Sequence, residues 1–295
     1  MKKLSIAVTT CLLLSTTVGA EKGEWVEWLA DVQLSYADIE NLNLSAFDDD
    51  SHQDQRLALD AVIGRFYQLD GLSRIHIALE FEAQKHQEFD RLDDVFLGAN
   101  FGFRYKFGLG FYQPYLQFNA NYGHKEVDYD VYSRDIFSSG IELGQHINNQ
   151  LSIAASIDFT STDGESGPNV VPELSSDVFS QSYFRASIYA DYILAQDWLL
   201  SASYARREGD FHSACNTVNV AKVLEVEEVK AITKDKIFVG CVYKLDGSSN
   251  IFSASLSYSL TRHSAINLFI ERYQGHADVL EYKNTSYSLS YNYRY

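Results

Sequence analysis

Asp210 and His212 are two residues apart in the stretch Asp210-Phe211-His212. In an extended strand, residues i and i+2 point to the same side, so a carboxylate and an imidazole would stand beside each other. Such a pair suits general-base chemistry, in which His212 would take a proton and Asp210 would orient its ring. The alternative interpretation is a polar pair at a strand end in contact with water. The strands around the pair decide between the two.

Charged residues recur at every second position of segments that are otherwise apolar. In the segment 75–82, aliphatic and aromatic residues alternate with a histidine and two glutamates. Such a polar face is unsuited to a packed core, but it suits the watery interior of a barrel whose other face contacts lipid. The pore-lining residues predicted on this basis are Asp60, Arg74, His76, Glu80, Glu82, Arg104, Lys106, Glu142, His146, Asp158, Arg185, Asp191 and Arg207.

The inward charges are of both signs, and of two interpretations the leading one is a porin-like passive channel for small polar solutes or ions. In a water-filled pore, opposite charges across the lumen create a transverse field that sorts ions and small polar solutes. The chain has a net charge of −16, which would favour cations weakly. In the alternative, the charges pair with one another and plug the barrel.

Cys215 and Cys241 are the only cysteines after residue 20. In an oxidising compartment they are candidates for a disulfide. The alternation places Cys241 on the lipid-facing side of a strand, whereas Cys215 falls in a loop. If the two cysteines meet, their strands are neighbours, which favours the lower of the strand counts below.

Thirteen segments alternate with a period of two, and short and long connections between them also alternate. The long connections are near 38–55, 85–93, 123–135 and 161–182. Alternately short and long connections are typical of transmembrane barrels, with short turns on the periplasmic side. The alternating segments are 30–36, 57–64, 75–82, 95–106, 116–122, 137–147, 151–159, 184–192, 198–205, 237–245, 252–260, 266–270 and 286–295.

The last ten residues show the pattern most clearly, with large side chains alternating with Ser286, Ser288, Ser290, Asn292 and Arg294. This segment resembles the C-terminal strand of bacterial outer-membrane β-barrel proteins, which typically end on an aromatic residue. The resemblance implies a single antiparallel all-β transmembrane barrel in residues 21–295. The side chains that form the lipid-facing signature are Tyr287, Leu289, Tyr291, Tyr293 and Tyr295.

The strand number is expected to be even, because both ends of a bacterial barrel normally lie in the periplasm. Adding a strand over 220–232, with a turn at 233–236 and a short outer loop at 246–250, gives about 14. Merging or dropping one segment gives 12. The count of 14 is favoured, although the charged segment 220–232 alternates badly and would also fit a helix in a loop.

Residues 1–20 are predicted to be a signal peptide. A basic start at Lys2 and Lys3 precedes an apolar stretch that ends in Val18-Gly19-Ala20. That stretch is too short for a membrane anchor, and the sequence before Cys11 makes a poor lipoprotein motif. The chain is therefore expected to be an integral protein of the Gram-negative outer membrane.

The Asp210-Phe211-His212 stretch also resembles the Asp-x-His pair of the omptin outer-membrane proteases. The resemblance implies that a second pair of aspartates would activate water at the barrel mouth. Asp48-Asp49-Asp50 and Asp93-Asp94 are in suitable loops, but their surroundings do not match that family. An enzyme is therefore not the leading prediction.

Acidic residues gather in the predicted outer loops. They could bind divalent cations that bridge to lipopolysaccharide phosphates, or form a repelling, solvated surface. The expected partners are membrane lipid, lipopolysaccharide and the barrel-assembly machinery, and the acidic balance argues against nucleic acid. No metal-binding motif and no cofactor motif is visible, and the oligomeric state stays open. The acidic loop residues are Asp48, Asp49, Asp50, Asp54, Glu126, Asp128, Asp130, Asp163, Glu165, Glu173 and Asp177.

Overall fold

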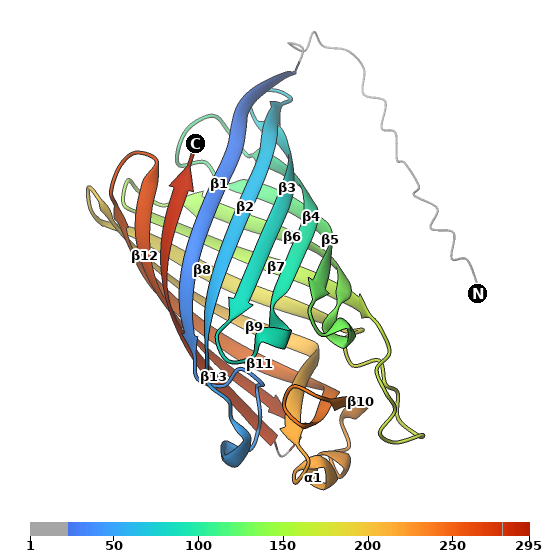
Figure 1. Ribbon diagram of the computed structural model, residues 1–295. Coiled ribbons are helices and arrows are strands. Elements are labelled where there is room, and N and C mark those ends of the chain that lie inside the picture. Colours follow the sequence, from blue (N-terminus) through green and yellow to red (C-terminus); the bar gives the residue numbers. More distant parts are fainter. Residues whose placement is uncertain (1–22, 279) are drawn as a thin grey trace, which may run out of the picture.

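The computed structural model describes residues 23–278 and 280–295, so the predicted signal peptide 1–20 lies outside the described residues (Figure 1). Within this part of the chain, no helix is long and apolar enough to span a bilayer. The strands are β1 (Glu24–Ile39), β2 (Asp54–Gln68), β3 (Ser73–His86), β4 (Asp94–Lys106), β5 (Tyr115–Val127), β6 (Arg134–His146), β7 (Leu151–Gly164), β8 (Ser182–Ala195), β9 (Trp198–Asn216), β10 (Val229–Asp235), β11 (Gly240–Ser259), β12 (Ser264–Ala277) and β13 (Leu280–Arg294). The helices are α1 (Val220–Leu224) and the 3₁₀ turns η1 (Asp48–Asp50), η2 (Asp90–Leu92) and η3 (Asp130–Tyr132).

Twelve strands form a closed antiparallel barrel. Each of β1–β8 pairs with the next strand, β9 pairs with β11, and β11–β12–β13 return to β1. The closing pair aligns Leu34 of β1 with Tyr291 of β13, inside the predicted C-terminal strand. The predicted all-β barrel is confirmed, with the alternative count of 12 strands rather than the favoured 14.

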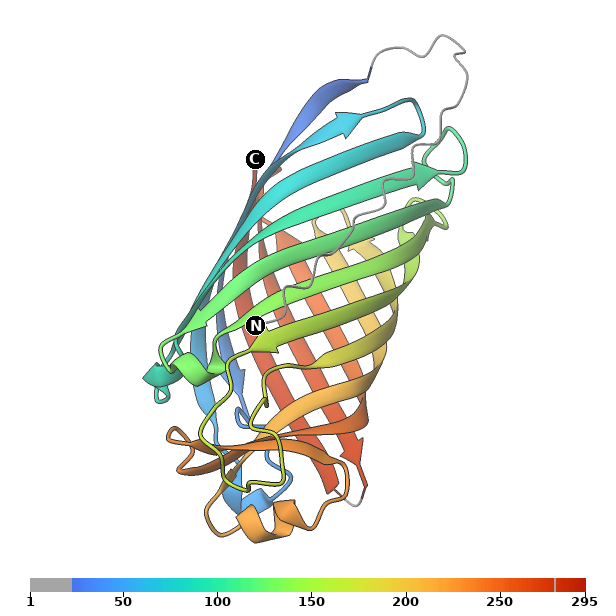
Figure 2. The same cartoon turned by 90° about the vertical axis from the view of Figure 1, so that its right-hand side faces the viewer.

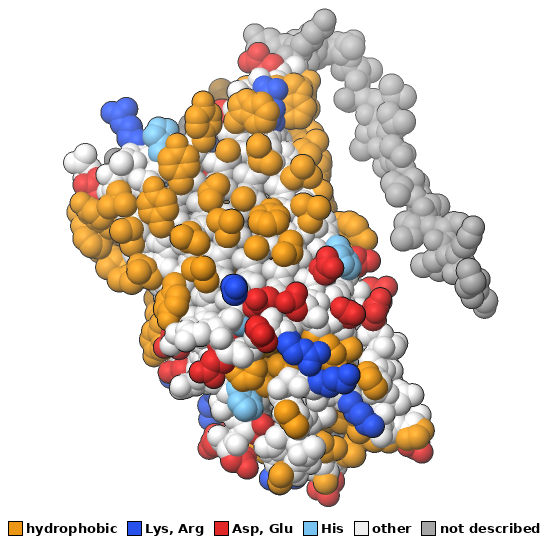
Figure 3. Space-filling model, in the orientation of Figure 1, with side chains coloured by type: hydrophobic (Ala, Val, Ile, Leu, Met, Phe, Trp, Pro, Cys, Tyr) orange, Lys and Arg blue, Asp and Glu red, His pale blue; other side chains and the backbone are white. Residues whose placement is uncertain are grey.

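The period-two pattern decides which face of each strand meets lipid. Large apolar side chains point outward and stay exposed, among them Ile63, Leu79, Leu97 and Ile157. Figure 3 shows them as a hydrophobic belt around the strands, with charged side chains below it at the loop end. In lipid this exposed apolar face is the stable arrangement, because the polar face then turns to the lumen.

The connections separate the two ends of the barrel. Short turns, such as 69–72 and 147–150, lie at the same end as the start of β1 and the C-terminus (Figure 1). The longer loops 40–53 and 165–181 lie at the other end. This is the predicted arrangement of short and long connections.

The strand predictions for residues 206–250 need correction. The predicted outer loop 246–250 lies inside the continuous strand β11. The proposed extra strand 220–232 is instead the short helix α1 followed by the start of β10. β10 has seven residues, fewer than the roughly nine to eleven that a membrane crossing needs. It pairs with the first residues of β11, outside the closed barrel.

We use the name cap for residues 210–216 of β9, β10 and residues 240–245 of β11, which form a three-stranded sheet beyond β8. The cap begins at Gly209, whose φ of +122° strongly favours glycine. A Cβ atom there would lie 2.6 Å from the carbonyl oxygen of Ser182. Gly209 therefore lets β9 leave the barrel wall, and Figure 2 shows the cap running across the loop end.

The cap contacts loops from around the mouth of the barrel. The N–H of Ala214 donates to the carbonyl oxygen of Asn43 at 2.9 Å. Lys244 Nζ donates to the carbonyl oxygen of Ser180 at 2.7 Å. Phe238, in the turn between β10 and β11, packs against Phe89 with ring centroids 5.1 Å apart. Apolar clusters cover both faces of the cap, so the outer loops and the cap form one packed unit over the mouth.

Cys215 and Cys241 form a disulfide between directly opposed residues of β9 and β11, with their Cα atoms 5.1 Å apart. Both cysteines are fully buried in the cap. The placement of Cys241 on a lipid-facing surface and of Cys215 in a loop is therefore wrong. Their strands are neighbours, in agreement with twelve strands.

Replacing both cysteines, as Cys215→Ala/Cys241→Ala, is expected to loosen the cap without unfolding the barrel wall. Closing a chain segment of 26 residues stabilises by about 3.5 kcal/mol in the chain-entropy estimate. Limited proteolysis of the segment 217–239 is therefore expected to be much faster in the variant, with unchanged heat-modifiable migration on a gel. Equal cleavage rates would show that the disulfide does not hold the cap.

Candidate functional site

The predicted pore-lining residues alternate with the outward apolar side chains of their strands, and most of them hydrogen-bond neutral groups. His76 contacts Asn100 at 2.7 Å, and Arg104 Nε donates to Gln117 at 2.6 Å. Glu80 and Glu82 accept from the side-chain amides of Asn121 and Gln84, respectively. Similar contacts join Glu142 to Tyr115 (2.8 Å), His146 to Ser152 (2.6 Å), Asp158 to Ser156 (2.8 Å), Arg185 to Ser187 (3.2 Å) and Asp191 to Ser201 (2.6 Å).

No salt bridge joins any two of the thirteen pore-lining residues, all of which lie in the described part of the chain. Arg207 instead donates to the backbone oxygen of Asp210 and covers the ring of Tyr183 at 3.6 Å. Asp60 and Glu82 are direct cross-strand partners of like charge. The charged wall therefore differs from a plug of mutually paired charges.

Two further strands, β11 and β13, carry small hydroxyl side chains on the lumen face. Along β11, Ser253, Ser255 and Ser257 alternate with the outward residues Phe252, Ala254 and Leu256. β13 continues the pattern with Ser286, Ser288 and Ser290. Serine leaves more space in the lumen than the long charged side chains of β2–β5.

Two cavities of about 480 Å³ each lie at the two ends of the lumen. The first, at the short-turn end, brings together Arg74, Arg104 and Lys106 beside the turn 69–72. The second lies beneath the cap, and we name it the vestibule. Its wall contains Arg56, Lys125, Arg134, Arg207 and Glu271, and its roof contains the cap residues His212, Ala214 and Val242.

Asp210 and His212 have different partners in the structure. Asp210 accepts hydrogen bonds from Lys230 Nζ at 2.8 Å and from the N–H of Ser182 at 3.1 Å. His212 Nδ1 contacts Gln181 Nε2 at 2.9 Å. The predicted pair is therefore not joined as a base and its orienting carboxylate.

His212 lies in the part of β9 beyond the barrel wall, close to several cations. Burial, followed by the charges of Arg134 and Arg207, lowers the pKa of His212 to about 3. The imidazole is therefore neutral near pH 7.

A buried Asp54–His86 pair was missed in the sequence. His86 Nδ1 lies 2.7 Å from Asp54 Oδ2, and both side chains are almost fully buried. The N–H of Glu88 also donates to Asp54. The two residues are 32 positions apart on the paired strands β2 and β3, so only the strand register would have brought them together.

The acidic loop residues do not act as one group. Asp50 is buried and accepts a hydrogen bond from the N–H of Asn216 at 2.7 Å, so it fastens loop 40–53 to the cap. Asp94 pairs with Lys125 at 3.0 Å. Among the described residues, no three His, Cys, Asp or Glu side chains are grouped as metal ligands.

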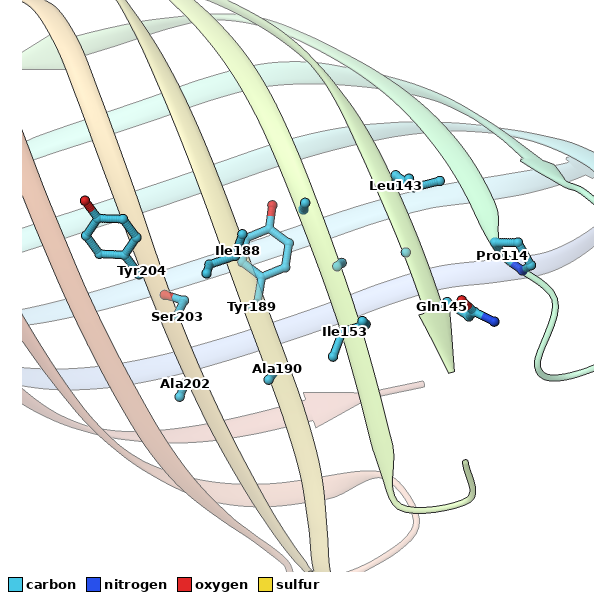
Figure 4. A pocket seen from close by; sticks show the side chains of 13 residues that line it. Pro114, Leu143, Gln145, Ile153, Ile188, Tyr189, Ala190, Ala202, Ser203 and Tyr204 are labelled. Atoms are coloured by element: carbon cyan, nitrogen blue, oxygen red, sulfur yellow. The ribbon is translucent and has the colours of Figure 1, made fainter. Parts of the chain in front are cut away.

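A further hollow of about 700 Å³ lies on β6–β9. Figure 4 shows Leu143, Ile153 and Ile188 around the small residues Ala190 and Ala202. The three large side chains are exposed on the lipid-facing side of their strands. This hollow therefore belongs to the lipid-facing surface rather than to the lumen.

No protein-family model matches the chain, and no curated protein matches its sequence. Among solved structures, the CymD monoaromatic hydrocarbon channel is 8% identical, with a TM-score of 0.46, and the match covers 91% of this chain and 88% of that one. The β domain of the Bordetella autotransporter BrkA is 9% identical, with a TM-score of 0.45 and coverage of 91% and 100%. The KdgM porin in complex with disordered oligogalacturonate is 9% identical, with a TM-score of 0.42 and coverage of 90% and 99%. The chain is thus similar to outer-membrane β-barrels as a class, and at these scores the likeness concerns the fold alone.

Acidification is expected to destabilise the cap through His212. The pKa of His212 is lowered from 6.5 to about 3 in the folded cap. Between these two pH values, His212 therefore binds a proton in the unfolded cap but not in the folded cap. This contribution to stability is complete above about pH 6.5 and decreases as the pH falls toward 3. An NMR titration is expected to show a neutral His212 imidazole down to about pH 4, and His212→Gln is expected to make cap opening less dependent on pH. Titration of His212 near its ordinary pKa would contradict this description.

Proposed function

We propose that this chain is an integral barrel of the outer membrane, present after removal of its signal peptide, that lets small polar solutes or ions pass passively. The observation that carries the proposal is the absence of salt bridges among the thirteen described pore-lining residues. In a dry interior, charges without opposite partners would be very costly. Water in the lumen removes that cost and gives polar solutes a path.

The two unlike walls support the same function. One wall carries charged residues such as Glu80 and Arg104, and the other carries the serines of β11 and β13. A lumen lined by charged side chains and small hydroxyl groups keeps space for water and favours polar over apolar solutes. We place the barrel in contact with outer-membrane lipid and lipopolysaccharide, and its insertion would need the barrel-assembly machinery.

The packing of the cap over the mouth supports a second candidate function. Loops 40–53 and 165–181 pack with the cap over the mouth, so the barrel would also suit a non-conducting surface protein whose loops bind a partner. The two functions differ in one measurable property, which is the passage of ions.

Purified protein in a planar bilayer is expected to give discrete channel events. Ser255→Trp places a large side chain in the lumen and is expected to reduce the conductance. The adjacent Leu256→Trp is the matched control, since it faces lipid and is expected to leave the conductance unchanged. The Cys215→Ala/Cys241→Ala variant is expected to open more often, because its cap is loosened.

If neither the natural protein nor the cap variant gives channel events, although both show folded migration on a gel, the channel is contradicted. That result would favour the partner-binding surface protein. Equal conductance in Ser255→Trp and Leu256→Trp would also contradict a path through this lumen.

A further inference from the structure

The lumen wall near the cap carries two pairs of cations. The two members of each pair are direct cross-strand partners. Lys125 of β5 is the cross-strand partner of Arg134 of β6, and Arg185 of β8 is the partner of Arg207 of β9. Like charges in directly opposed positions destabilise a sheet. In a chain with 40 acidic and 24 basic residues, this gathering of cations in one region calls for an explanation.

The nearest carboxylates act electrostatically on the two arginines of the vestibule, Asp94 on Arg134 and Asp210 on Arg207, but they form their salt bridges with other cations. Asp94 pairs with Lys125 at 3.0 Å, and Asp210 pairs with Lys230 at 2.8 Å. Neither Arg134 nor Arg207 forms a salt bridge with a residue that the structure describes. Glu271 is the remaining carboxylate in the vestibule wall, and it also forms no salt bridge with a described residue.

Donor groups of the vestibule also lack partners. Arg207 Nε is buried without a hydrogen-bond partner, and the same is true of Arg56 Nε. Arg134 donates to the backbone oxygen of Tyr132 at 3.0 Å, the one hydrogen bond found for its side chain among the described residues. Buried polar groups are usually satisfied, so the unpartnered guanidinium N–H groups around this cavity need a partner, which an ion or a water molecule would supply.

We propose that the vestibule binds a small anion carrying carboxylate or phosphate groups, held mainly by Arg134 and Arg207 with Lys125 and Arg56 around them. This deepens the proposed channel function, on which its role in solute passage rests. Guanidinium groups bind both kinds of oxyanion through paired hydrogen bonds. The volume of about 480 Å³ lies in the usual range for small-molecule sites.

A third opposed pair, Arg74 and Arg104, stands at the other end of the lumen beside Lys106. An anion that leaves the vestibule would therefore meet a second cationic region before the short-turn end. The opposed acidic pair Asp60 and Glu82 lies on β2 and β3. Arg56 of β2 and Lys125 of β5 both act on this pair electrostatically.

Isothermal titration of the refolded, full-length mature barrel with citrate and, separately, with inorganic phosphate tests the site. Arg134→Gln and Arg207→Gln are each expected to weaken binding about tenfold or more, the value of one charge-assisted hydrogen bond. Arg206→Gln is the matched control: Arg206 is the neighbour of Arg207 on β9, points outward and pairs with Glu208. It is expected to bind like the natural protein. The tighter of the two anions identifies the group that the site prefers.

Binding lost in both glutamine variants and kept in Arg206→Gln supports the site. If a glutamine variant does not show folded migration on a gel, Arg207→Lys decides, since it keeps the charge, loses the paired donors and is expected to bind with intermediate affinity. No binding of either anion by the natural protein, or an equal loss in Arg206→Gln, would overturn the site. Anion binding without any conductance supports the site and contradicts only the channel, whereas conductance without anion binding overturns only the site.

Discussion

The pairing of β1 with β13 is the constraint on which the rest of the structure depends. Hydrocarbon offers no partner to a backbone N–H or C=O group, so a sheet can cross a membrane only when it has no free edge. Leu34 opposite Tyr291 sets the register of that closing pair. Closure turns one face of every strand toward lipid and the other toward the lumen. It therefore decides which side chains line the lumen.

The structure uses polar side chains differently inside and outside this closed wall. In the lumen, charged side chains hydrogen-bond neutral neighbours such as Asn100 and Gln117. Beyond the wall, the cap is a packed unit with a buried disulfide and apolar clusters on both faces. The net charge of −16 therefore does not describe the lumen, because many acidic residues lie in the loops while four cations lie in the vestibule wall. The weak preference for cations inferred from net charge stays a prediction for the channel as a whole, whereas the proposed anion site concerns the vestibule.

Period-two alternation was enough to predict the barrel, because each crossing strand has one face in lipid and one in water. It failed in residues 206–250 for a physical reason. In β10, five of the seven residues are buried, since the cap is covered on both faces and the alternation disappears. The contacts that matter most in the vestibule depend on register, such as Lys125 opposite Arg134, and a single sequence does not specify register. The buried pair of Asp54 and His86 escaped notice for the same reason.

Thiol labelling of single cysteines tests the water-filled lumen most directly. Ser288 and Leu289 are neighbours on β13 and face the lumen and the lipid, respectively. In vesicles, Ser288→Cys is expected to react with a charged, water-soluble thiol reagent, whereas Leu289→Cys is expected to stay unreactive. The native disulfide stays intact in both variants. An unreactive Ser288→Cys in a folded barrel would contradict a hydrated lumen and, with it, the proposed passage of polar solutes.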